Sequence, residues 1–304
     1  MRSRRLLRFT LIGTACLTVV LAGQSAGRAT TGPATTALAT TGPATTGPSA
    51  GFNDWSCRPA AAHREPVVLL HGLGGNGPGN FAYLGPYLAS AGFCVFAPTY
   101  GESVPGIPVG GLTPIPQSAT EIAAFIDQVL TATGATQADL VGHSEGGFQA
   151  LYGPKFVPGE AAKIARVVAL APPTHGTTFA SLVTIGDDLG VTPAADAVIA
   201  AGCPACTELT TGSALVASLN TGWVAVPGIA YTIIASTHDE LVTPYGTEFV
   251  TGQGVDNETV QGFCPLDPVG HIGLAYDPDV AQLVRNALDP ADPVPVTCTV
   301  GPPV

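Results

Sequence analysis

The segment Gly142-His143-Ser144-Glu145-Gly146 has residue types and a spacing that could support covalent catalysis. It follows an apolar run that ends at Val141, and it leads into Gly146–Leu151, which is typical of a helix. A serine on such a strand–turn–helix connection has its hydroxyl raised to the edge of a sheet, beside a helix N-terminus that favours developing negative charge. The pattern therefore predicts Ser144 as a nucleophile. The alternative is a chance turn in a chain with 38 glycines.

A second glycine-rich segment, His71-Gly72-Leu73-Gly74-Gly75, directly follows the apolar run 67–70. Acyl transfer passes through a tetrahedral oxyanion, and losing one backbone N–H that stabilises it costs about 3–4 kcal/mol. Glycines leave such N–H groups unobstructed. We expect the backbone N–H groups of Leu73 and Glu145 to form this oxyanion hole, and His71 to steady its own loop. The alternative is an ordinary strand-to-helix turn.

A serine nucleophile needs a base, and the base needs an orienting acid. When the serine lies on a strand–turn–helix connection, the chain order is Ser, then Asp or Glu, then His. Three histidines follow Ser144: His175, His238 and His271. Only His271 follows the acid candidates and lies in a loop before a last helix, so we predict it as the base. His143 is expected only to fill the variable position of the serine motif.

The acid should follow a late strand, and Asp239 stands shortly after the apolar run 231–235. Its neighbour Glu240 is the alternative carboxylate. The side chains of adjacent residues diverge in extended or turn backbone, so only one of the two should face His271. The predicted catalytic triad is therefore Ser144, Asp239 and His271.

Strands and helices alternate around these residues. Five short apolar runs are typical of strands buried on both faces, namely 66–70, 94–97, 139–141, 166–170 and 229–235. Ser118–Glu121 has the pattern of a capping box at the start of one helix, and Asp277-Pro278 opens a last helix. This order predicts an α/β fold with a mainly parallel central sheet flanked by helices. This alternation is interrupted by two irregular segments, 102–117 and 175–228, which should flank Ser144.

The first residues are typical of an export signal, with four arginines before the apolar run 9–21 and small residues after it. We predict a signal peptide at 1–29, a Thr/Pro/Gly-rich disordered linker at 30–52 and a catalytic domain at 53–304. The apolar run is too short to span a membrane comfortably, so no stable membrane anchor is expected. The protein is predicted to be secreted, and a monomer is expected.

The net charge and the number of cysteines further restrict the class of protein and its partners. Without the four arginines at positions 2–8, 7 basic and 22 acidic residues remain, a net charge of −15 that argues against nucleic acid as a partner. An even number of cysteines in an exported chain suggests disulfides, and six remain here with fifteen possible pairings: Cys57, Cys94, Cys203, Cys206, Cys264 and Cys298. A zinc site at 203–206 would need a second ligand pair, which the chain does not offer, so no metal is predicted.

The chain resembles the secreted actinobacterial lipases and esterases of the class 2 lipase family, within the α/β-hydrolase superfamily. The resemblance spans about 66–288 and is carried by the segments 71–75, 142–147, 171–178 (Ala-Pro-Pro-Thr-His-Gly-Thr-Thr), 238–244 (His-Asp-Glu-Leu-Val-Thr-Pro) and 271–278 (His-Ile-Gly-Leu-Ala-Tyr-Asp-Pro). It implies the α/β-hydrolase fold, lipid ester hydrolysis and no organic cofactor. The disulfide pairs 57–94, 203–206 and 264–298 are favoured in part because they fit this architecture.

The combined prediction is a serine carboxylic-ester hydrolase, and a triacylglycerol lipase in particular, that forms an acyl-enzyme. Neutral lipid or acyl esters are the expected substrates, because neither irregular segment contains a cationic residue and both carry apolar ones: Val104, Ile107, Val109, Leu112 and Ile115, then Phe179, Leu182, Val183 and Ile185. Two alternatives stay open. One is an acyltransferase acting on envelope lipids, and the other is a catalytically silent lipid- or cell-wall-binding homologue.

Overall fold

The structure is a computed structural model that describes residues 51–178 and 202–301. The predicted signal peptide, nearly all of the predicted linker and the four apolar residues at 179–185 lie outside the described residues. In the described part, strands form one sheet in the order β1-β3-β2-β4-β5-β6-β7, and every neighbouring pair is parallel. The strands are β1 (Gly51–Phe52), β2 (Val67–Leu70), β3 (Cys94–Phe96), β4 (Ala138–His143), β5 (Ile164–Leu170), β6 (Ala230–Ala235) and β7 (Val255–Thr259).

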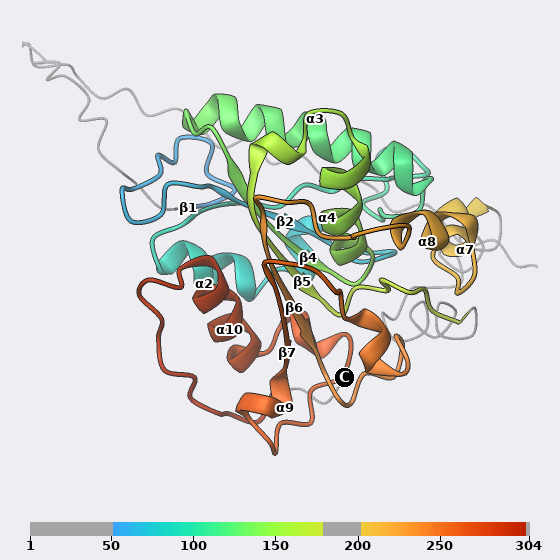
Figure 1. The fold of residues 1–304 in the computed structure, drawn as a ribbon. Coiled ribbons are helices and arrows are strands. Elements are labelled where there is room, and N and C mark those ends of the chain that lie inside the picture. Colours follow the sequence, from blue (N-terminus) through green and yellow to red (C-terminus); the bar gives the residue numbers. More distant parts are fainter. Residues whose placement is uncertain (1–50, 179–201, 302–304) are drawn as a thin grey trace, which may run out of the picture. The chain divides into compact units, whose positions relative to one another are not determined.

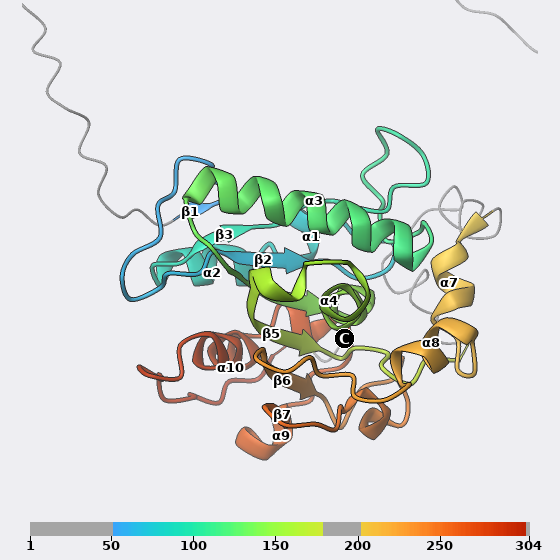
Figure 2. The same cartoon turned by 45° about the horizontal axis from the view of Figure 1, so that its top comes forward.

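Helices cover both faces of this sheet (Figure 1). They are α1 (Gly77–Asn80), α2 (Leu84–Ser90), α3 (Ile115–Thr133), α4 (Glu145–Phe156), α7 (Pro204–Glu208), α8 (Ala214–Leu219), α9 (Val260–Phe263) and α10 (Pro278–Leu288), with short 3-10 turns η1 (Ala161–Lys163), η2 (Tyr245–Glu248) and η3 (Gly273–Ala275). Figure 2 shows α3 and α4 on one face and α2 and α10 on the other, with α7 and α8 on the side toward which β2 and β5 point.

Each face of the sheet has its own apolar core. Phe148 of α4 and Ile126 of α3 are fully buried in the first core, and Leu88 of α2 and Val284 of α10 are fully buried in the second. The central strands contribute to both, because successive side chains point to opposite faces. The continuous apolar runs predicted as strands are therefore explained by burial on both sides. The predicted strands at 66–70, 94–97, 139–141, 166–170 and 229–235 are confirmed to within two residues at each end.

The two edge strands were not predicted. Strand β1 pairs with β3 and begins at Gly51, so the sheet includes two residues that the sequence assigned to the linker. Asn53 extends this attachment, since its side-chain oxygen accepts a hydrogen bond from the Ala97 N–H at 2.8 Å. Strand β7 has the sequence Val-Asp-Asn-Glu-Thr and no fully buried residue, because an edge strand needs less apolar cover.

The start of α3 differs from the prediction. The helix begins at Ile115, with a proline in its first turn, three residues before the predicted capping serine. Ser118 instead hydrogen bonds with the Thr113 hydroxyl at 2.9 Å, and Glu121 accepts from the Gly101 N–H. The carboxylate of Glu208 in α7 caps the helix, since it accepts the Ile115 N–H at 2.7 Å. A cap 93 residues away in the chain leaves no local sequence signal.

The start of α10 agrees with the prediction. Asp277 is the N-cap, and its Oδ1 accepts the N–H groups of Asp279 at 2.7 Å and Val280 at 3.1 Å. The structure also joins the six cysteines in the favoured pairs, with Cα–Cα separations of 5.7, 5.3 and 5.3 Å for Cys57–Cys94, Cys203–Cys206 and Cys264–Cys298. Within the described part of the chain, no helix combines the length and apolar character needed to cross a bilayer.

Candidate active site

Ser144 lies at the turn between β4 and α4 with a φ of 56° and a ψ of −119°. A non-glycine residue adopts a positive φ only where its surroundings impose it, and such strain is common at nucleophiles. The flanking glycines are required by close packing: a Cβ on Gly142 would lie 2.1 Å from the Gly146 carbonyl oxygen, and one on Gly146 would lie 2.0 Å from the Leu70 carbonyl oxygen. The structure thus explains why this turn has glycines two residues on either side of the serine.

The predicted acid and base lie in direct contact. His271 Nδ1 is 2.6 Å from Asp239 Oδ2, and both side chains are fully buried. Asp239 Oδ1 accepts the backbone N–H groups of Leu241 at 2.8 Å and Val242 at 2.7 Å, which fixes the carboxylate. Burial alone would raise the pKa of Asp239, but the His271 ring and these hydrogen bonds outweigh it and lower the pKa. Among the described residues, His271 Nε2 has no hydrogen-bond partner, so it is available to a proton donor.

Glu240 also contacts His271, which the sequence analysis did not expect. Its Oε2 accepts the His271 backbone N–H at 3.2 Å, whereas Asp239 holds the ring. The two adjacent carboxylates do diverge, as predicted, but they reach different atoms of one residue. Asp239 sets the orientation of the imidazole and Glu240 fixes the backbone that carries it.

A third carboxyl, Glu248 of η2, lies beside Asp239. It is fully buried, and neither of its oxygens finds a hydrogen-bond donor in the described part of the chain. Burial and then the neighbouring charge of Asp239 raise the pKa of Glu248 well above its usual value, while the pKa of Asp239 is lowered. These opposite shifts favour the negative charge on Asp239, the residue in contact with His271, over Glu248.

The predicted oxyanion loop is tied to the serine turn by Asn80 of α1. The Gly72 N–H donates to Asn80 Oδ1 at 2.8 Å, and Asn80 Nδ2 lies 3.2 Å from His143 Nδ1. The N–H groups of Gly74 and Gly75 donate to the carbonyl oxygens of Gly110 and Gly72. No described residue accepts the Leu73 N–H, so this group is free for a ligand. Glu145 is the first residue of α4, where backbone N–H groups have no partner inside the helix.

His143 has a larger role than the variable position of a motif. Its Nε2 lies 2.9 Å from the His271 carbonyl oxygen, and burial lowers the pKa of His143 to about 3, so the ring is neutral. The consistent arrangement has Asn80 Nδ2 donating to His143 Nδ1, and the His143 Nε2–H donating to His271. This chain of hydrogen bonds connects the oxyanion loop, the serine turn and the loop of the predicted base.

The buried Tyr100 hydroxyl connects the same elements from the other side. Tyr100 Oη lies 2.6 Å from the His71 carbonyl oxygen and 2.5 Å from Glu145 Oε2. A phenol has one hydrogen, so Tyr100 donates either to the His71 carbonyl oxygen or to a Glu145 carboxylate. When it donates to His71, the contact with Glu145 requires the carboxylic acid form of that residue. Burial raises the pKa of Glu145 to about 8, although the hydrogen bonds with Tyr100 and Gln149 lower it.

His71 steadies its loop, as predicted. The Tyr100 N–H donates to His71 Nε2 at 3.3 Å, so the ring hydrogen is on Nδ1, which lies 2.8 Å from the Gly72 carbonyl oxygen. Burial lowers the pKa of His71 to about 4, and the ring is therefore neutral.

A cavity of about 300 Å³ opens between the oxyanion loop and the serine turn. Ser144, His143 and Leu73 line it, together with Val109 and Ile272 from two further segments. None of its described lining residues has an acidic, lysine or arginine side chain. The cavity can hold a neutral group against the serine. Its volume is at the lower end of the range that is usual for ligand pockets, roughly 300–1,000 Å³.

The irregular segment 102–117 is only partly at this cavity. Val109 lines it, and Val104 and Ile107 are 40% and 46% exposed. Leu112 and Ile115 are buried in the core, so these two apolar residues pack onto the sheet and do not line the cavity. Ile115 is the first residue of α3, which explains its burial.

Sequence reasoning did not find Asn80, Tyr100 or Glu248. An asparagine shortly after a glycine-rich loop and a tyrosine after a strand are common, and their contacts span 63 and 45 residues of chain. Glu248 follows Asp239 by nine residues, and no local sequence pattern sets it apart, since neither lysine nor arginine occurs between Arg166 and Arg285. Each of these roles depends on tertiary contact.

Comparisons with known proteins agree with this geometry. A family model described as alpha/beta hydrolase fold matches residues 65–195, a stretch that contains the serine turn and ends before Asp239. Triacylglycerol lipases of Pseudarthrobacter phenanthrenivorans and Burkholderia plantarii are each 34% identical over 131 residues. This covers 40% of the chain and 37% and 33% of those proteins. The chain thus matches only about a third of the length of these curated relatives.

Solved structures match over more of the chain. Lipase B of Aspergillus fumigatus has a TM-score of 0.59 at 21% identity, covering 79% of this chain and 57% of that one. The monoacylglycerol lipase of Paleococcus ferrophilus has a TM-score of 0.51 at 20% identity, covering 77% of this chain and 95% of that one. Together with the parallel sheet, its flanking helices and the strained serine turn, these matches establish that the chain has the α/β-hydrolase fold.

Proposed function

We propose that the chain is a secreted serine ester hydrolase that cleaves neutral acyl esters, triacylglycerols among them. One observation carries the proposal. A strained serine lines a cavity, and the buried Asp239–His271 pair leaves the histidine Nε2 without a partner. That combination supplies a nucleophile, a base and an orienting acid. The similarity to triacylglycerol lipases supports the substrate class.

In the proposed reaction, Ser144 Oγ attacks the ester carbonyl carbon while its proton passes to His271 Nε2. Asp239 holds the opposite ring nitrogen and stabilises the charged imidazolium. The tetrahedral oxyanion is stabilised by the N–H groups of Leu73 and Glu145. The carbon–oxygen bond to the alcohol then breaks as His271 returns the proton to the leaving oxygen. Water cleaves the acyl-enzyme in the same two steps and regenerates Ser144.

Family and location are part of this proposal. The motifs at 71–75, 142–147 and 271–278 support a member of the secreted actinobacterial class 2 lipases. The basic and apolar start of the chain supports a signal peptide at 1–29, and its Thr/Pro/Gly-rich continuation supports a linker. Three disulfides suit an oxidising compartment. N-terminal sequencing of the protein from culture medium tests the cleavage.

Activity should be highest on acyl esters that carry no charged group. We expect turnover of p-nitrophenyl esters of medium chain length and of emulsified triacylglycerol, and none of a peptide amide. The expected preference for uncharged esters follows from the absence of acidic, lysine and arginine side chains among the described residues that line the cavity. Initial rates across the ester series measure this. Turnover confined to acetyl esters of sugars would reject the lipase assignment, and products formed with added alcohols would reveal an acyltransferase.

The cavity wall offers a matched pair of variants. Val109→Phe places a larger side chain in the cavity and should lower kcat/KM for a decanoyl ester by about tenfold while leaving an acetyl ester within about threefold. Val104→Phe, on the exposed part of the same loop, should leave both rates unchanged. Equal losses for the two esters in Val109→Phe would show that the acyl chain lies elsewhere.

The buried acid predicts a pH limit. Because the pKa of Glu145 is raised from 4.5 to about 8, its side chain is neutral at pH 7 and loses its proton as the pH rises through about 8. The Tyr100 hydroxyl then donates to the Glu145 carboxylate, its hydrogen bond to the His71 carbonyl oxygen is lost, and a negative charge develops beside the oxyanion loop. We expect kcat/KM to fall above pH 8 in the native enzyme. Measurements of kcat/KM between pH 6 and 10 test for this fall. A thermal unfolding midpoint that stays constant over the same range excludes unfolding as its cause.

Glu145→Gln is the matched test of that assignment. A glutamine amide donates to Tyr100 without titrating, so the fall above pH 8 should disappear while the rate at pH 7 stays within about tenfold. Tyr100→Phe should lower the rate at every pH, because it removes both hydrogen bonds. If kcat/KM still falls above pH 8 in Glu145→Gln, the fall is caused by the titration of another group.

A further inference from the structure

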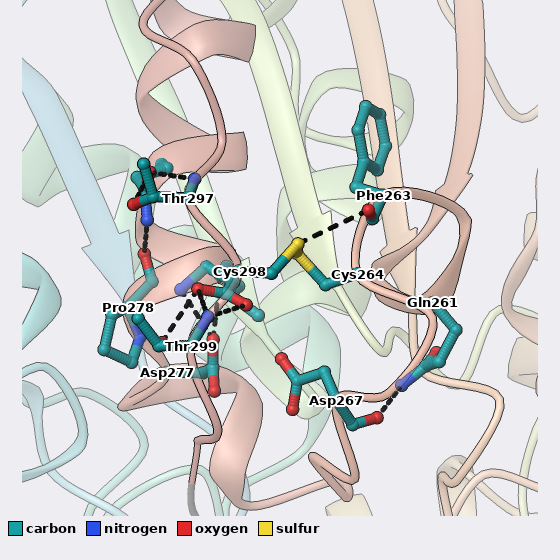
Figure 3. The surroundings of a disulfide bond; sticks show 12 residues. Gln261, Phe263, Cys264, Asp267, Asp277, Pro278, Thr297, Cys298 and Thr299 are labelled. Carbon is teal, nitrogen blue, oxygen red and sulfur yellow. Dashed lines mark hydrogen bonds between the residues drawn. A yellow bond between two sulfur atoms is a disulfide. The ribbon is translucent and has the colours of Figure 1, made fainter.

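Three buried aspartates meet beside the Cys264–Cys298 disulfide. Asp267, Asp277 and Asp279 are 1%, 1% and 0% exposed, and each offers a carboxylate oxygen within 4.8 Å of the others. Figure 3 shows Asp267 on the segment that follows Cys264, and Asp277 at the start of the neighbouring helix. The two sides of the cluster flank His271 in sequence, four residues after Asp267 and six before Asp277.

The hydrogen bonds of the cluster leave two oxygens without a donor. Asp279 accepts the Thr299 N–H at 3.0 Å and the Thr299 hydroxyl at 2.9 Å. Asp277 Oδ1 caps α10, and Asp267 Oδ1 accepts the Val269 N–H at 3.0 Å. In the described part of the chain, Asp267 Oδ2 and Asp277 Oδ2 have no hydrogen-bond partner, and none of the three aspartates forms a salt bridge.

Unpaired carboxylates inside a protein are strongly unfavourable, and three that face one another repel as well. Such a group is tolerated only if protons or a cation compensate the charge. The donor set consists of hard carboxylate oxygens, and the nearby sulfurs of Cys264 and Cys298 are joined in a disulfide. Oxygen donors of this kind favour calcium or magnesium over zinc or copper.

We propose that Asp267, Asp277 and Asp279 bind a calcium ion. Calcium accepts several protein carboxylates in irregular geometry, whereas magnesium demands a near-ideal octahedron and keeps most of its waters, so calcium suits a buried cluster of three carboxylates better. The ion bridges the segment before His271 to the first turn of α10. Through Asp279 it also holds the C-terminal segment at Thr299. Its role is to fix the loop of the predicted base, and it takes no part in the chemistry.

The test compares thermal unfolding of the full chain in calcium chloride, magnesium chloride and EGTA. At about a hundredfold excess over the dissociation constant, calcium should raise the unfolding midpoint by about 5–10 °C, and magnesium should raise it less. Asp267→Asn should abolish the rise. Asparagine keeps the oxygen that accepts the Val269 N–H, so the local fold is retained. Asp256→Asn removes one exposed carboxylate from β7 and should leave the rise intact.

The order of stabilities is the decisive result. In EGTA, Asp267→Asn should be as stable as the native chain or more so, because repulsion is relieved, and in calcium it should be the less stable of the two. If Asp267→Asn does not fold, Asp277→Asn replaces it, since asparagine is also a favoured N-cap. An unchanged midpoint in calcium, together with equilibrium dialysis that finds no bound calcium, would overturn the proposal. The test measures binding and stability, so its outcome is independent of the proposed hydrolase activity.

Discussion

Replacing Ser144 with alanine is expected to abolish covalent labelling by a fluorophosphonate and to lower kcat by about four orders of magnitude or more. The hydroxyl is the only group of the proposed triad that forms a bond to the acyl carbon, so the remaining residues cannot substitute for it. Folding should be unaffected, because alanine fits the same turn. Intact mass after labelling and rates on a p-nitrophenyl ester measure the two effects.

Ser118→Ala is a suitable control for that experiment. Ser118 is also fully buried but lies in α3, where its hydroxyl bonds with Thr113. We expect this variant to label and to turn over substrate as the native chain does. Labelling retained in Ser144→Ala would assign the nucleophile to a different residue. A native chain that never labels would favour the catalytically silent, lipid- or wall-binding alternative.

Asp239→Asn should lower kcat by about 10³–10⁴-fold. Asparagine keeps an oxygen for the N–H groups of Leu241 and Val242, so the loop stays in place. Its amide, however, would face His271 Nδ1 with a hydrogen. The imidazole would then carry its own hydrogen on Nε2, where the proton of Ser144 must be received. The loss should therefore be in kcat, with KM nearly unchanged, as steady-state kinetics on a soluble ester can show.

Glu240→Gln distinguishes the two adjacent carboxylates. Glu240 accepts the His271 backbone N–H, and a glutamine oxygen can accept it too. The expected loss is about tenfold or less. If Glu240→Gln were the more damaging change, the orienting acid would have been assigned to the wrong residue.

The residues of the proposed triad could be singled out in the sequence because their signals are local. Ser144 has glycines on both sides for reasons of close packing, and Asp239 and His271 follow it in the order that its turn requires. The central strands were predictable because burial on both faces makes them continuously apolar. By contrast, β7 was missed because an edge strand can be polar. The cap of α3 was missed because Glu208 comes from a distant segment.

The residues that hold the site together were less accessible to sequence reasoning. Asn80, Tyr100 and His143 act by hydrogen bonds that cross from one loop to another, and their residue types are unremarkable in their own segments. The protonation of Glu145 is also a tertiary effect, since it follows from the depth at which the fold places the side chain. A single sequence specifies these contacts but shows no pattern that reveals them.

The parallel arrangement of every described strand pair has a consequence for how this protein can diverge. Each described strand ends at the same rim, so the described parts of the connections between β3 and α3 and between β5 and β6 leave the sheet there. Insertions and replacements in these two connections can reshape what is accepted, while Ser144 stays at the end of β4 and Asp239 and His271 stay in the segments that follow β6 and β7. Selection, or a laboratory that exchanges these loops, can therefore explore new specificities without rebuilding the catalytic machinery.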